Sequence, residues 1–137
     1  MKLVSACLLG VNCRYNAEEK SNDRVLELQK KELLIPVCPE QLGGLPTPRE
    51  AAEQKEGRVI GKSGKDYTTE FTKGANEVLK IAKLNNISEA ILKQRSPSCG
   101  SGKVYDGSFT KTIIEGDGVT SLLLKKHNIK VISEEDL

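Results

Sequence analysis

The 137-residue sequence lacks the features of a protein that binds nucleic acid or a membrane. It has no tryptophan, and aromatic residues make up 4% of the chain, so an aromatic platform for stacking bases is poorly supported. Lys and Arg number 21 against 19 Asp and Glu, which gives a net charge of +2. This balance is too even for the basic surface that nucleic acids and anionic membranes attract. We therefore expect neither a nucleic acid nor a membrane as a partner.

Long hydrophobic runs and a recognisable targeting segment are also missing. No apolar run approaches the ~20 residues that span a bilayer. The segment MKLVSACLLGVNC has a short apolar stretch without a basic region before it or a convincing cleavage site, so it does not match a signal peptide. We expect a cytoplasmic protein, in a reducing compartment where structural disulfides are rare. Its four cysteines are then metal ligands, catalytic groups or buried core residues.

Histidine is nearly absent, and no two cysteines form a CxxC pair. The single histidine, His127, follows Lys125 and Lys126 at the end of a predicted helix. The helix dipole favours cationic residues at that position. Without a CxxC pair, neither a zinc ribbon nor a thioredoxin-type redox motif is present. Any Cys–His or Ser–His–Asp arrangement would have to use His127.

Segments with the apolar spacing of strands alternate with segments that have the spacing of helices. The clearest helix spans residues 69–84, and its apolar face comprises Phe71, Ala75, Val78, Leu79 and Ala82. The remaining predicted segments are strand 2–8, helix 21–31, strand 33–37, strand 90–93, helix 119–126 and strand 129–132. This alternation predicts one compact α/β domain over residues 1–137, with a mostly parallel, Rossmann-like sheet of about four strands flanked by helices.

The region between residues 43 and 67 departs from this alternation. Two glycines and two prolines break the chain between residues 43 and 48. We expect a short helix over residues 50–55. Residues 58–60 and 65–67 flank the sequence GKSG, which predicts a small hairpin.

Three cysteines follow three of the predicted strands. Cys7 comes at the end of the first, Cys38 directly follows the second, and Cys99 lies in the loop after the third. The carboxyl ends of parallel strands share one edge, where ligands of open α/β sheets bind, and adjacent strands lie about 4.8 Å apart. We expect the three thiols to converge there, close enough for one polynuclear cluster. The alternative is that they are small buried hydrophobic residues.

The number of thiols limits the metal that they could hold. Structural zinc usually has four nitrogen or sulfur ligands, whereas three cysteines suit a four-iron cluster with one open iron. An open iron can act as a Lewis acid toward a soft sulfur atom. Cys13, six residues after Cys7, could be a fourth ligand, a resolving thiol or a bystander, and we interpret it as a bystander.

Three polar residues near these cysteines are candidates for the site. Glu40 follows Cys38 by two residues and could transfer protons or cap the turn after it. Ser96 could bond a substrate or shape the turn at Pro97, and the residues alone favour the turn. Arg49 could hold an anion or an internal carboxylate.

Four motifs carry a resemblance to a known family. At CLLG (7–10), PVCPEQLGGLPTPR (36–49), SPSCG (96–100) and YDGSF (105–109), the chain resembles the thiouracil desulfidase (TudS) family, long catalogued as a domain of unknown function. The resemblance spans almost the whole chain. It implies an α/β domain with a [4Fe-4S] cluster held by three cysteines, whose fourth iron takes the sulfur of a thiolated nucleobase. The implied reaction is a non-redox desulfuration that yields the oxo base and hydrogen sulfide.

The resemblance also implies roles for individual residues. Cys7, Cys38 and Cys99 match the cluster cysteines, and Glu40 and Ser96 match positions associated with catalysis. Thiouracils, other thiopyrimidines and thio-modified nucleosides all fit the implied substrate. A cluster with an exposed iron is vulnerable to oxygen, so we expect aerobically prepared protein to lose it.

Two departures from the family pattern keep an alternative function open. Asn16-Ala17 replaces the more common Asp-Gly or Asn-Gly turn, and Cys13 is an additional thiol. In the alternative, the thiols belong to a non-catalytic zinc- or iron–sulfur-binding module that senses redox state. A fourth ligand at Cys13 would favour that module.

Overall fold

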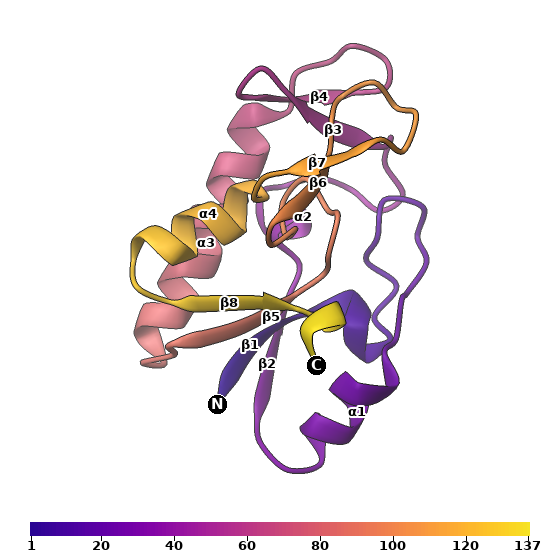
Figure 1. The fold of residues 1–137 in the computed structure, drawn as a ribbon. Helices are drawn as coiled ribbons and strands as arrows, with labels where there is room; N and C mark the ends of the chain where they lie inside the picture. The colour runs from indigo at the N-terminus through magenta and orange to yellow at the C-terminus, as the bar shows by residue number, and fades with distance from the viewer.

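A parallel sheet forms the centre of the molecule (Figure 1). The structure is a computed structural model that describes residues 1–137. The strands are β1 (Lys2–Ser5), β2 (Leu34–Val37), β5 (Glu89–Leu92) and β8 (Lys130–Ser133), in the spatial order β2-β1-β5-β8 with every neighbouring pair parallel. The predicted four-stranded parallel sheet is confirmed.

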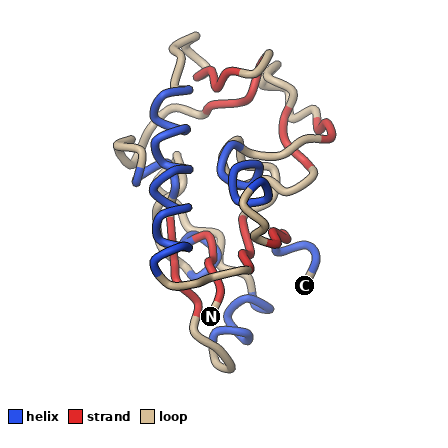
Figure 2. Tube along the Cα trace, turned by 90° about the vertical axis from the view of Figure 1, so that its left-hand side faces the viewer, coloured by secondary structure: helices blue, strands red, loops and turns tan.

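Helices cover both faces of this sheet, so the domain has three layers. Helices α3 (Thr68–Leu84) and α4 (Val119–Lys126) pack on one face, and Figure 2 shows α3 running along one side of the molecule. The 3₁₀ turn η1 (Ala6–Leu9) and helix α1 (Asp23–Gln29) cover the other face. None of the helices combines the length and apolar character needed to cross a membrane.

The alternation of side chains along each strand supplies both layers of the core. Leu3 packs among the residues under α3 and α4, whereas its neighbour Val4 packs among those of η1 and α1. Both are fully buried, because successive residues of a strand point to opposite faces. Burial of such side chains stabilises the fold by roughly 1.5–3 kcal/mol each.

The helices predicted over residues 21–31, 69–84 and 119–126 are present as α1, α3 and α4. Asn22 caps α1, and its Oδ1 accepts hydrogen bonds from the N–H groups of Arg24 and Val25. Helix α3 ends at Leu84 with Asn85 as its C-cap, and Asn86 follows with a φ of 53°. The predicted apolar face of α3 is buried along its whole length.

Strand β2 accommodates a proline because it lies at the edge of the sheet. Pro36 has no N–H to donate, which a central strand tolerates poorly. Only β1 pairs with β2, so Pro36 breaks no ladder on its outer side.

The structure corrects the predicted helix over residues 50–55. That segment instead contains β3 (Ala52–Lys55), which pairs antiparallel with β4 (Arg58–Gly61). Glu56 and Gly57 join them with φ values of 51° and 78°, the conformation of a tight hairpin turn. The predicted pairing of residues 58–60 with 65–67 is reduced to one bridge, Ile60 with Asp66.

Three further features were missing from the sequence prediction. Strand β1 ends at Ser5, and the residues that follow form η1. A one-turn helix, α2 (Pro39–Leu42), follows β2. A second hairpin of β6 (Lys103–Tyr105) and β7 (Ile113–Glu115) lies beside the first hairpin at the top of Figure 1.

Candidate active site

A cavity of about 380 Å³ opens at the carboxyl edge of the parallel sheet. The segments that directly follow β1, β2 and β5 line one side of it, and residues of β3 and β6 line the other. The sheet topology alone accounts for the first side, because parallel strands end at one edge. The two hairpins turn that edge into a cavity.

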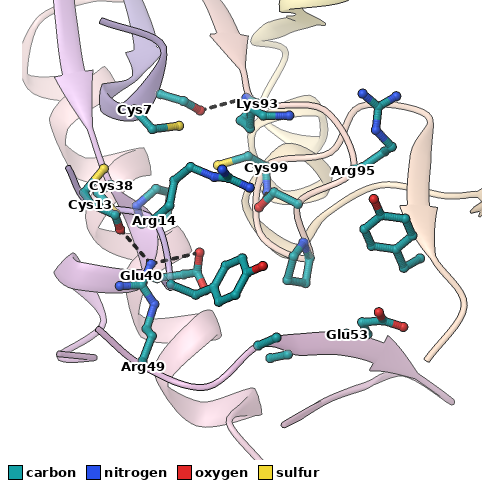
Figure 3. A pocket seen from close by; sticks show the side chains of 18 of the residues that line it. Cys7, Cys13, Arg14, Cys38, Glu40, Arg49, Glu53, Lys93, Arg95 and Cys99 are labelled. Atoms are coloured by element: carbon teal, nitrogen blue, oxygen red, sulfur yellow. Dashed lines mark hydrogen bonds and ion pairs between the residues drawn. The ribbon is translucent and has the colours of Figure 1, made fainter. Parts of the chain in front are cut away.

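Cys7, Cys38 and Cys99 all line this cavity (Figure 3). Cys7 lies in η1 rather than at the end of the strand, Cys38 precedes α2, and Cys99 lies in the loop after β5. Cys7 and Cys99 are buried, and Cys38 is partly buried. The structure therefore brings together the three thiols that the sequence analysis singled out.

The fourth cysteine lies beside them. Cys13 is 2% exposed and also lines the cavity, and its carbonyl oxygen accepts a hydrogen bond from Cys38 Sγ at 3.6 Å. A hydrogen bond with Cys38 favours the Cys13 thiolate, but a hydrogen bond with Cys7 and burial outweigh it and raise the pKa of Cys13 to about 11. Cys13 is thus a neighbour of two candidate ligands.

Two of the other thiols, Cys99 and Cys38, have raised pKa values that keep them protonated at neutral pH. Complete burial raises the pKa of Cys99 to about 12, against hydrogen bonds from Ser5 and Ser98 that lower it. The pKa of Cys38 is also raised, first by its hydrogen bond with Cys13 and then by burial. Because thiolates are the ligating form, a metal group that binds here must displace these protons.

The spacing of the thiols tests what kind of metal group they fit. No three Cys, His, Asp or Glu side chains of the protein approach closely enough to share one metal ion. The three thiols instead surround a cavity, and thiolates are the usual ligands of iron–sulfur clusters. The donor set and its spread fit a polynuclear cluster better than a single zinc ion.

Glu40 enters the cavity from the first turn of α2. Pro39 occupies the first position of that helix, where proline is favoured. Its restricted backbone limits how the Glu40 carboxylate is placed relative to Cys38. Glu40 Oε2 lies 3.4 Å from Arg49 Nη2, and the two side chains are 20% and 6% exposed. Of the two alternatives for Arg49, it holds an internal carboxylate.

The Ser96 hydroxyl shapes its own turn and also lines the cavity. Ser96 Oγ accepts hydrogen bonds from the N–H groups of Ser98 at 3.1 Å and Cys99 at 3.0 Å. The turn interpretation of Ser96 is therefore confirmed. Its hydroxyl proton is still available to donate toward a ligand.

The loop that carries Cys99 is fixed to the start of α4. The carbonyl of Ser98 accepts a hydrogen bond from Thr120 N at 2.8 Å, and the carbonyl of Cys99 accepts one from Ser121 Oγ at 2.7 Å. A side chain at Gly118 would place its Cβ 2.3 Å from the Ser98 carbonyl carbon. This close approach leaves the loop little freedom to move.

The Arg14–Glu18 loop keeps a tight turn without glycine. Ala17 has a φ of 63°, in the left-handed region that favours glycine. Asn16 Oδ1 accepts a hydrogen bond from Glu18 N at 3.1 Å, a local bond that supports the turn. The turn therefore forms with alanine at position 17, and Arg14 and Tyr15 line the cavity.

Sequence reasoning missed several cavity residues because they lie on loops and hairpins whose position depends on the whole fold. Of three tyrosines and two phenylalanines, Tyr15, Tyr105 and Phe109 line the cavity. Buried Glu53 accepts hydrogen bonds through Oε1 from the N–H groups of Gly107 at 3.0 Å and Phe109 at 3.1 Å. Five cations that the sequence analysis did not single out also line it: Arg14, Lys62, Lys93, Arg95 and Lys111.

One carboxylate of the acidic C-terminal segment, that of Glu134, supports the site. Glu134 pairs with Lys93, a cavity residue, at 3.1 Å, and the two side chains are 9% and 15% exposed. Glu134 also accepts a hydrogen bond from Gln94 N at 2.7 Å. Strands β5 and β8 are parallel neighbours, so the residues after both strands meet at the same edge. His127 ends α4 as expected and does not line the cavity.

Comparisons with known proteins agree with this arrangement. The 2-thiouracil desulfurase family matches residues 3–136. An uncharacterized protein of Bacillus subtilis (strain 168), YbbK, is 42% identical, and the match covers 100% of this chain and 97% of that protein. A solved structure described as the [4Fe-4S]-dependent thiouracil desulfidase TudS superposes with a TM-score of 0.94 at 42% identity. That match covers 99% of this chain and 91% of the other.

Proposed function

The chain belongs to the 2-thiouracil desulfurase family, and from this premise we propose that it removes sulfur from a thiolated pyrimidine with the help of a [4Fe-4S] cluster. It is an enzyme of the thiouracil desulfidase type. The overall reaction consumes one water and converts a thiocarbonyl into a carbonyl and hydrogen sulfide. No electrons are transferred to or from the substrate.

Cys7, Cys38 and Cys99 would hold the cluster. They line one cavity from three separate segments, and three thiolates leave one iron of a four-iron cluster without a protein ligand. When bound, the cluster supplies a Lewis acid for the thiocarbonyl sulfur. Cys13 lies beside Cys7 and Cys38, and we propose that it does not ligate the cluster.

Glu40 is the proposed general base. Water must lose a proton as it attacks the thiocarbonyl carbon, and the departing sulfur must gain one. Glu40 lines the cavity with Cys38 and Cys99, and its carboxylate can accept the first proton and donate it in the second step. Glu53, the other acid of the cavity, already accepts two backbone hydrogen bonds.

Ser96 and the aromatic residues are proposed to recognise the flat ring of the substrate. Ser96 Oγ accepts two backbone hydrogen bonds, which orient its remaining proton as a donor to the substrate or to the developing negative charge. Tyr15, Tyr105 and Phe109 line the same cavity, and aromatic rings favour stacked or edge-on contacts with flat ligands. A pyrimidine fits these surroundings better than an aliphatic thiocarbonyl.

The convergence of three thiols and Glu40 on one cavity carries this proposal. The test is anaerobic reconstitution with iron and sulfide, followed by sulfide release from 2-thiouracil by wild-type, Glu40→Gln and Ser96→Ala protein. General acid–base help contributes about 10²–10⁴-fold in rate, so Glu40→Gln should keep full iron and lose most turnover. Ser96→Ala should be affected in the same direction but less. A Glu40→Gln protein with full iron and unchanged turnover would remove Glu40 from the mechanism.

A further inference from the structure

We propose that Arg49 is a positioning residue, which acts by holding the Glu40 carboxylate in place beside the cavity. The proposal rests on the role of general base proposed for Glu40, and it assigns a role to the ion-pair partner of that carboxylate. Figure 3 shows Arg49 next to Glu40 and Cys13, on the far side of the carboxylate from Cys99.

Arg49 joins the Cys13 loop and α2 to its own segment. Its Nη2 donates to the carbonyl oxygen of Cys13 at 2.8 Å and lies 3.4 Å from Glu40 Oε2. Its Nη1 donates to Pro46 O at 3.1 Å and to Thr47 Oγ1 at 2.9 Å. The fixed fork of a guanidinium suits such simultaneous contacts, which a single ammonium group cannot reproduce.

Because Arg49 is buried, its charge depends on the Glu40 carboxylate. The side chain is 6% exposed, and its Nε–H is buried without a hydrogen-bond partner. A charge that is desolvated this far needs an opposite charge nearby. Glu40 is its only ion-pair partner, so each group fixes the position of the other.

The ion pair with Arg49 leaves one oxygen of the Glu40 carboxylate free for proton transfer. Arg49 engages Oε2 and no other cation lies within ion-pair distance of Glu40, so Oε1 is free to accept a proton. The Cys13 carbonyl that Arg49 binds also accepts the hydrogen bond of Cys38 Sγ. Arg49 therefore fixes the carboxylate relative to the neighbouring thiol, and general acid–base catalysis depends on such placement.

A double-mutant cycle tests the proposal in the anaerobically reconstituted protein. Turnover per cluster, KM, iron content and melting temperature are measured for Arg49→Lys, Glu40→Gln and the double variant. Arg49→Lys should lower kcat by on the order of 10-fold or more with little change in KM, a smaller loss than the 10²–10⁴-fold expected for Glu40→Gln. In the Glu40→Gln background, Arg49→Lys should cause no further loss, because the group that it positions is already missing.

Matched controls separate positioning from a structural role. Arg58→Lys alters an exposed arginine–carboxylate pair outside the cavity, with Asp66 at 2.8 Å, and should leave kcat unchanged. In the protein without a cluster, Glu40→Gln and Arg49→Lys should lower the melting temperature non-additively, since both break one pair. Added guanidinium should restore part of the turnover of Arg49→Gly.

The outcomes distinguish this proposal from the one it rests on. An equal fold-loss from Arg49→Lys in both backgrounds, or a loss of iron and melting temperature with unchanged kcat per cluster, would show a structural role and overturn it. A Glu40→Gln protein with wild-type turnover would instead overturn the role of Glu40 itself.

Discussion

Cys7, Cys38 and Cys99 reach the cavity from three different segments, and Cys13 reaches it from a fourth. Cys7 and Cys99 belong to opposite halves of the core, on the two faces of the sheet. The thiols are therefore held by separate parts of the fold and do not depend on one flexible loop. Thiols held by separately packed elements limit the ordering cost of binding a metal group.

Single cysteine substitutions should separate ligands from neighbours. Cys7→Ala, Cys38→Ala and Cys99→Ala should each abolish or badly damage the cluster, because each removes one of three thiolate ligands. Cys13→Ala should retain it. Iron and acid-labile sulfide, measured after anaerobic reconstitution, give the answer. Loss of the cluster from Cys13→Ala alone would show that Cys13 is a ligand and would favour the non-catalytic module.

The reactivity of Cys99 should report its burial. A pKa raised to about 12 leaves little thiolate near neutral pH, whereas an unfolded cysteine titrates near 8.5, and the thiolate is the form that reacts. In reduced protein without a cluster, iodoacetamide labelling of Cys99 should be at least ~100-fold slower at pH 8 than in denaturant. Its rate should still rise about tenfold per pH unit from 8 to 10, where the denatured rate levels off. Peptide mass spectrometry measures both, and equal native and denatured rates would contradict the burial of this thiol.

Individual site residues were predictable to the extent that they follow strands. Cys7, Cys38 and Glu40 closely follow β1 or β2, and Cys99 lies in the loop after β5, so parallel topology brings them to one edge. Phe109 was not predictable in this way. Its place depends on two hairpins and on the hydrogen bond to Glu53, contacts between segments that no local pattern encodes.

At the scale of elements, the contact between α2 and α3 fixes the segment that carries Cys38 and Glu40. Gly43 and Gly74 face each other there, and a Cβ at Gly74 would lie 1.9 Å from the carbonyl oxygen of Pro39. Only glycine permits this approach. The resemblance to other family members over residues 36–49 is thus matched by a packing requirement in a distant helix.

Replacing Gly74 with alanine should therefore disturb the site through the fold. The added methyl group would push α2 away from α3, and such overpacking typically costs about 1–3 kcal/mol, against a gain of up to about 1 kcal/mol in helix propensity. We expect a lower free energy of unfolding in urea together with lower iron content. Lys73→Ala, an exposed change on the same helix, should alter stability by less than about 0.5 kcal/mol. A Gly74→Ala protein as stable as wild type would show that α2 can shift freely.

Elements with a strong apolar pattern were predictable, and elements without one were not. Helix α3 has a continuous buried face, and α4 was expected with the bounds that it has, Val119–Lys126. Strand β3 (Ala52–Lys55) has three consecutive polar residues after Ala52, and its only buried residue is Glu53. It therefore lacks the alternation of apolar and polar residues that marks a strand. Strand β7 (Ile113–Glu115) is exposed throughout, so no hydrophobic periodicity marks it.

At the scale of the whole molecule, the sheet and the two hairpins have separate tasks. The sheet lies between the two clusters of buried apolar side chains and brings the thiols to one edge. The hairpins close the cavity and supply Glu53, Tyr105 and Phe109. This division explains why the fold class and the thiols could be predicted from the sequence, whereas the walls that face a substrate could not.

The most direct test of the proposed chemistry is the fate of water oxygen in the reaction. Protein that was reconstituted anaerobically is incubated with 2-thiouracil in H₂¹⁸O, without an added reductant or oxidant, and cluster-free protein serves as the control. Hydrolytic, non-redox desulfuration predicts one sulfide per uracil formed, one ¹⁸O in each uracil, and no reaction in the control. Sulfide without labelled uracil, a need for an electron donor or acceptor, or equal activity without the cluster would contradict it.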